Sequence, residues 1–119
     1  MVKHFLCKLV PPRSTFAFDM TETEATFMQQ HVGYWQRLSD QGIAVIFGPV
    51  LDPTGVWGLG IVEAADEPEV HALSEQDPIM KSGLGFRFEV YDRRQKTGVA
   101  GVQEFRILQG RQNFRFCNS

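Results

Sequence analysis

Residues 30–55 read QHVGYWQRLSDQGIAVIFGPVLDPTG. A helical wheel over residues 22–41 places the apolar side chains on one half of the circumference, with His31 near the centre of that half. The next segment, IAVIF at 43–47, is apolar on both faces, as in a strand covered on two sides. In DPTG at 52–55, proline fixes its own φ and glycine tolerates positive φ, which favours a turn. The region therefore predicts a helix, a strand and a turn, with a histidine pointing into the protein.

A buried imidazole needs a hydrogen-bond partner, and Asp52 is the expected partner of His31. The strand that follows the helix ends close to this carboxylate in the sequence. A carboxylate beside an imidazole fixes which ring nitrogen carries the proton, and so prepares an acid/base pair. The alternative is a core histidine whose ring bonds to a backbone carbonyl. The spacing of the two residues leaves both interpretations open.

The flanking segments complete a βαββαβ order. Strand periodicity appears at 2–10, 56–63 and 86–91. TETE at 21–24 is a capping box, and DEPE at 66–69 puts a cap, acidic residues and a proline at the start of a second helix. This order predicts an α+β, ferredoxin-like fold, in which a four-stranded antiparallel sheet carries two helices on one face.

The 119 residues suffice for one domain, and their charge is unevenly distributed. Residues 1–92 carry 6 Lys and Arg against 13 Asp and Glu, whereas residues 93–119 carry 6 against 1. We take 1–92 as the domain and 93–119 as a basic C-terminal extension that is flexible or weakly packed. The aromatic side chains of the extension are too scattered to form a stacking platform, so nucleic-acid binding is not expected.

Several classes of protein are excluded by what the sequence lacks. No run approaches the roughly 18 apolar residues of a membrane helix, and the N-terminal strand is too interrupted for a signal peptide. We therefore expect no membrane partner and a cytoplasmic location. Cys7 and Cys117 stand in no metal or redox spacing and are expected to be reduced. The three histidines lie on separate elements, and no glycine pattern suits a dinucleotide, so neither a metal nor a cofactor is expected.

The predicted helices cover one face of the sheet only, which leaves an apolar face open. The strand 43–47, expected to be central, is apolar on both faces, and Trp57, Leu59 and Ile61 share the next strand. A bare apolar sheet face would be an unusual exposed patch on a monomer. A second copy packed sheet against sheet about a two-fold axis would cover it, so we expect a homodimer.

An ordered set of short motifs gives the chain a resemblance to a known family. The motifs are FL at 5–6, PPR at 11–13, DMT at 19–21, MQQH at 28–31, YW at 34–35, FGPV at 47–50, DPTG at 52–55, WGL at 57–59, DP at 77–78 and GLGF at 83–86. Over residues 1–92 the chain resembles the YciI-like, or YCII-related, family. The resemblance implies a dimeric α+β barrel, related in shape to muconolactone isomerases. It also implies an active-site histidine and aspartate that match His31 and Asp52. One activity in the family is dehydrochlorination of a chlorinated hydroquinone.

Three further residues are candidates for substrate binding. The planar fork of Arg13 could hold a substrate carboxylate or phenolate, although a surface role fits as well. Trp35 could form an aromatic wall for a ring-shaped substrate, although a core role is commoner for such a residue. Asp77 precedes a proline, a position from which a carboxylate often caps backbone amides.

Two hypotheses of function follow. In the first, the protein is a cofactor-free lyase or isomerase that acts on a small cyclic or aromatic molecule, with His31 moving the proton and Asp52 orienting it. In the second, it is a non-catalytic dimeric module that binds a ligand or a partner, and the two residues form a structural hydrogen bond.

Overall fold

The computed structural model of the protein describes residues 2–93. Its elements are β1 (Lys3–Val10), α1 (Phe16–Asp19), α2 (Glu22–Asp40), β2 (Ala44–Val50), β3 (Trp57–Ala64), α3 (Glu67–Glu75), α4 (Pro78–Lys81) and β4 (Arg87–Asp92). Without the single-turn helices α1 and α4, the order is the predicted βαββαβ. The basic extension 93–119 lies, apart from Arg93, outside the described residues.

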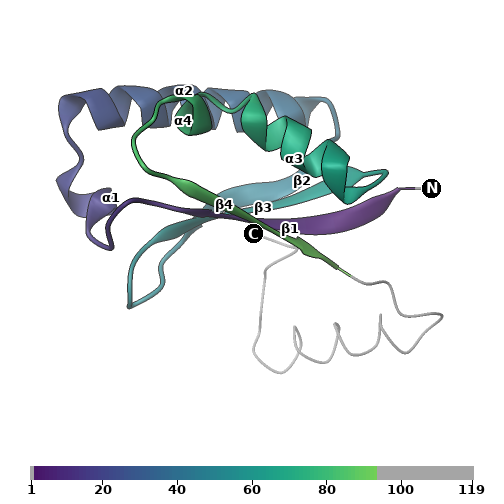
Figure 1. Ribbon diagram of the computed structural model, residues 1–119, viewed down its shortest axis with the longest axis horizontal. Helices are drawn as coiled ribbons and strands as arrows, with labels where there is room; N and C mark the ends of the chain where they lie inside the picture. Colours follow the sequence, from purple (N-terminus) through teal and green to yellow (C-terminus); the bar gives the residue numbers. More distant parts are fainter. Residues whose placement is uncertain (1, 94–119) are drawn as a thin grey trace.

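The strands form one sheet in the order β2-β3-β1-β4, and every neighbouring pair is antiparallel. Helices α2 and α3 lie on the same face of this sheet (Figure 1). This arrangement confirms the predicted ferredoxin-like α+β fold. None of the helices between residues 2 and 93 combines the length and apolar character that crossing a bilayer requires.

The ends of the helices follow the local signals in the sequence. Thr21 and Glu24 form the predicted capping box, in which each side chain accepts a hydrogen bond from the backbone N–H of the other residue. After α2 the chain turns at Gly42, whose φ of 79° is a left-handed conformation that favours glycine at the end of a helix. Asp66 caps α3 by accepting from the backbone N–H of Glu69, as predicted.

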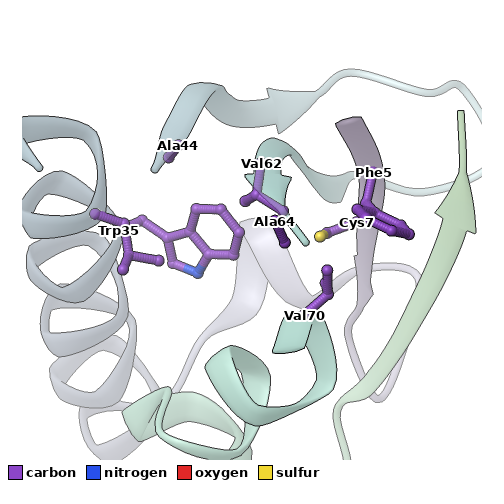
Figure 2. Close-up of a cluster of buried hydrophobic side chains, with 8 residues drawn as sticks. Phe5, Cys7, Trp35, Ala44, Val62, Ala64 and Val70 are labelled. Atoms are coloured by element: carbon purple, nitrogen blue, oxygen red, sulfur yellow. The ribbon is translucent and has the colours of Figure 1, made fainter. Parts of the chain in front are cut away.

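The main core lies between the helices and the sheet (Figure 2). Alternate side chains of β1 and β3 point toward the helices. The indole of Trp35 in α2 extends toward Val62 and Cys7 (Figure 2). Fully or nearly fully buried members of this core are Phe5, Cys7, Trp35, Val62 and Val70. The indole of Trp35 thus fixes α2 to the sheet, and it lies beside the ring of His31 on the same helix.

Two details differ from the expectations. The strand expected at the centre of the sheet, β2, is an edge strand, and Val45 within it is 55% exposed. An edge position tolerates Pro49, which has no N–H to donate to a neighbouring strand. The second difference is α1, a single-turn helix that the predicted βαββαβ order does not include. Phe16 of α1 is buried and packs edge-on against Phe86, with ring centroids 5.0 Å apart.

Candidate functional site

A cavity of about 440 Å³ is lined by α1, α2 and the strands of the sheet. Its lining is almost entirely apolar, and aromatic residues from five elements and from the turn before β4 contribute to it. They are Phe16, Trp35, Phe47, Trp57, Phe86 and Phe88. His31 also lines the cavity, with 14% of its side chain exposed. The cavity therefore combines a large apolar surface with one imidazole, as ligand sites commonly do.

The partner of His31 is Asp77. The distance between Nδ1 of the imidazole and Oδ2 of the carboxylate is 2.8 Å. Asp77 is fully buried, at the start of α4, where α4 packs against α2. The predicted pairing of His31 with Asp52 is therefore wrong.

Asp77 also accepts hydrogen bonds from Trp35 and Ile79. Nε1 of the indole donates to Oδ2 at 2.9 Å, and the backbone N–H of Ile79 donates to Oδ1 at 3.0 Å. Indole and amide N–H groups can only donate, so both oxygens of Asp77 act as acceptors. In the neutral ring, the imidazole of His31 then donates through Nδ1, which leaves the lone pair on Nε2.

The Nε2 atom of His31 is accessible. It makes no hydrogen bond to any described residue. Every buried polar side-chain atom of the described residues has a hydrogen-bond partner, so an atom without one is not buried. Nε2 is therefore accessible, and the imidazole lines the cavity. A lone pair held in this way can accept a proton from a molecule in the cavity.

Asp52 binds within its own turn and to a second tryptophan. Oδ1 accepts from the backbone N–H and the hydroxyl of Thr54, at 2.9 and 2.8 Å, and Oδ2 accepts from Nε1 of Trp57 at 3.2 Å. The bonds from Thr54, followed by that from Trp57, hold the pKa of the Asp52 carboxyl below its usual range. Asp52 does not line the cavity. The Trp57 indole that it binds lies against Lys8, the neighbour of Leu59 on the open face of the sheet, so this hydrogen bond is on the side of the sheet away from the helices.

Arg13, a candidate for substrate binding, lies outside the cavity lining. Its guanidinium donates to both carboxylate oxygens of Glu24, at 2.7 and 2.9 Å, and to Asp19 at 2.9 Å. It also lies over the ring of Phe16, 5.2 Å from the centroid. Arg13 therefore links α1 to the start of α2. It lies behind Phe16, and Phe16 rather than Arg13 lines the cavity.

Trp35, the remaining candidate, forms a cavity wall and belongs to the core as well. Its ring rests directly on Gly60 of β3, where an added Cβ would lie 2.6 Å from the indole. This glycine therefore makes the position of the indole possible. The sequence left open a cavity wall and a core residue, and Trp35 lies in both surroundings.

Sequence reasoning missed the direct contact of Asp77 with His31. The signal was the place of Asp77 before Pro78, which indicated a helix cap, and the cap does bring the carboxylate beside α2. Among residues 2–93 no group of three His, Cys, Asp or Glu side chains is placed to hold a metal ion.

Fold and site together define a small α+β domain with a histidine facing an apolar cavity. A family model, that of the YCII-related domain, matches residues 5–94. The chain belongs to the YCII-related family. One similar solved structure is that of the uncharacterized protein TM1266 from Thermotoga maritima, which is 12% identical, with a TM-score of 0.46 over 79% of this chain and 100% of that chain. A similarity this distant carries no argument about this chain. No curated protein matches it.

Proposed function

We propose that the protein is a cofactor-free lyase or isomerase that moves a proton on a small cyclic or aromatic molecule. His31 is the base, and Asp77 is the positioning residue that fixes its tautomer. The observation that carries the proposal is the accessible Nε2 of an imidazole whose other nitrogen is bonded to a fully buried carboxylate. Positioned general bases contribute about 10²–10⁴ in rate.

The proton step follows from this geometry. Nε2 takes a proton from a carbon next to a carbonyl group, and the electron pair of the broken C–H bond moves into an enolate. Return of the proton to another carbon completes an isomerisation. In a lyase, loss of an anion from the neighbouring carbon forms a C=C bond, and the leaving group departs with its bonding pair. The imidazolium remains bonded to Asp77 during either sequence, which stabilises its positive charge.

A second candidate function is ligand binding without catalysis. The three hydrogen bonds to Asp77 favour it, because they would hold α2 to α4 whether or not chemistry takes place. Under this alternative, loss of the imidazole lowers stability and abolishes no reaction.

Deuterium exchange separates the two candidates. γ-Butyrolactone and 2-cyclohexenone carry C–H groups next to a carbonyl, and their exchange in D₂O can be followed by proton NMR. We expect the wild type to accelerate exchange and His31→Gln to lose about 100-fold or more of that acceleration. His71→Gln is the matched control, since this histidine is exposed, pairs with Glu67 and does not line the cavity. Equal acceleration by wild type and His31→Gln would contradict the catalytic proposal.

We also propose that the protein is a homodimer that pairs through the open sheet face. On this face Leu6 is the direct neighbour of Ile61 on one side and Tyr91 on the other, and Lys8 is the neighbour of Leu59. Tyr91 is 52% exposed although it belongs to an apolar row. A second copy would bury this row and so remove its apolar surface from water, which is favourable.

A further inference from the structure

The cavity contains no charged side chain apart from the imidazole when it is protonated. The other titratable group in its lining is the thiol of Cys7, and burial raises the pKa of that thiol to about 12. Cys7 is therefore neutral at physiological pH. The remaining lining of the described cavity consists of glycine, proline and apolar side chains.

Two cations of the described residues lie near the cavity but outside its lining. Arg13 lies behind Phe16 and is bonded to Glu24 and Asp19. Lys8 lies over the Trp57 ring, 4.7 Å from its centroid, on the open face of the sheet. Neither cation lines the cavity, so neither can pair with a ligand inside it.

A carboxylate is also held behind a cavity wall. Asp77 bonds to the indole of Trp35, which lines the cavity. While the imidazole is neutral, an anion in the cavity would lose its hydration, find no cation to pair with, and lie near this carboxylate. A neutral ring would instead bury apolar surface against aromatic walls, where stacked and edge-on contacts are favourable.

We propose that the cavity selects uncharged ring compounds and rejects those that carry a carboxylate or phosphate. The compound presents a single acidic O–H or C–H to Nε2 of His31. An apolar cavity of roughly 150 Å³ holds benzene, so 440 Å³ has room for one or two rings with small substituents. The acidic proton rests on the proposed function, whereas the selection by charge rests on the cavity alone.

The test compares 4-hydroxybenzamide with 4-hydroxybenzoate, which have nearly the same shape and differ in charge. Binding is followed in the full-length protein by calorimetry and by the NMR signals of the cavity residues. We expect the amide to bind at least tenfold more tightly than the carboxylate. Equal or tighter binding of the carboxylate, or failure of both probes to bind, would overturn the proposal.

A variant pair tests the physical cause of the selection. Met28 lines the cavity one helical turn before His31, so Met28→Arg supplies the missing cation, and Met28→Gln changes polarity without charge. We expect Met28→Arg to reverse the preference and Met28→Gln to keep it. If Met28→Arg does not fold, Val32→Arg takes its place, because Val32 lines the cavity and is 50% exposed. An unchanged preference in the folded arginine variant would contradict the charge argument.

The two proposals fail separately. If the amide is preferred but the wild type accelerates no exchange, the selection by charge holds and the catalytic function fails. If exchange is accelerated but the carboxylate binds as well as the amide, the function holds and the selection fails.

Discussion

Asp77 is the residue on which the candidate site depends most. It is fully buried, and its two oxygens accept from an imidazole, an indole and a backbone amide. A buried carboxylate in an apolar region is costly unless such donors surround it. The same bonds that make its burial possible fix the orientation of His31.

Replacing Asp77 by asparagine tests this dependence. The new NH₂ group cannot accept, so at least one of the three donors loses its acceptor, at a cost of about 1–3 kcal/mol. For a domain of this size the melting temperature should fall on the order of 10 °C. The NH₂ group can donate to Nδ1 of His31 and move the ring proton to Nε2, so deuterium exchange should also be lost. A melting temperature equal to that of the wild type, measured by calorimetry, would contradict this account.

The sequence could predict that His31 faces inward, but not which acid it meets. Asp52 and Asp77 both stand before a proline in a turn, and both bond to a tryptophan in the structure. Which of them reaches α2 depends on the packing of α4, a contact between segments 46 residues apart. Patterns that span a few neighbouring residues carry no information about a contact between residues so far apart in the sequence.

At the scale of elements, the contact between α2 and β3 depends on Gly60. An added Cβ would lie 2.6 Å from the Trp35 ring, so Gly60→Ala should displace the indole and destabilise the protein by about 1–3 kcal/mol. Gly33→Ala in α2 is the matched control, because its Cβ would meet only Arg37, at 3.7 Å. That change should stabilise the helix by about 0.5–1 kcal/mol. Urea unfolding measures both effects, and a shift of the same sign in the two variants would argue against the packing described.

The hydrogen bonds of Arg13 to Asp19 and Glu24, which link α1 to α2, make the stability of the protein depend on pH. The hydrogen bond from Arg13, followed by that from the backbone of Thr21, lowers the pKa of Glu24 to about 2. The ordinary value is about 4.3, so this contribution is fully present above about pH 5 and is lost as the pH falls through about 2. Between pH 5 and pH 2.5 the melting temperature of the wild type should therefore fall further than that of Glu24→Gln. An equal fall of the melting temperature in the two proteins would show that the bonds between Arg13 and Glu24 do not contribute to stability.

Most of the elements were predictable because their signals are local. The capping box at Thr21, the glycine at 42 and the cap at Asp66 act within one turn of the residues they influence. The edge position of β2 was not predictable from its apolar sequence alone. An apolar run of this length is equally compatible with a central strand, and the order of strands is set by the crossovers.

At the scale of the whole molecule, the proposed dimer explains the apolar row on the open face. We expect light scattering at micromolar concentration to give twice the chain mass of 13.5 kDa. Ile61→Arg places a charge in the centre of this row, next to Leu6, and should shift the mass toward that of the monomer. A monomeric mass for the wild type would contradict the dimer.

The central claim is that the cavity-facing nitrogen of His31 is a free base. The ¹⁵N chemical shifts of the imidazole, measured in the full-length protein above neutral pH with and without 4-hydroxybenzamide, test it most directly. The account predicts a proton on Nδ1, no proton on Nε2, and a change at Nε2 when the probe is added. A neutral ring that carries its proton on Nε2, or a probe that leaves Nε2 unchanged while it occupies the cavity, would contradict it.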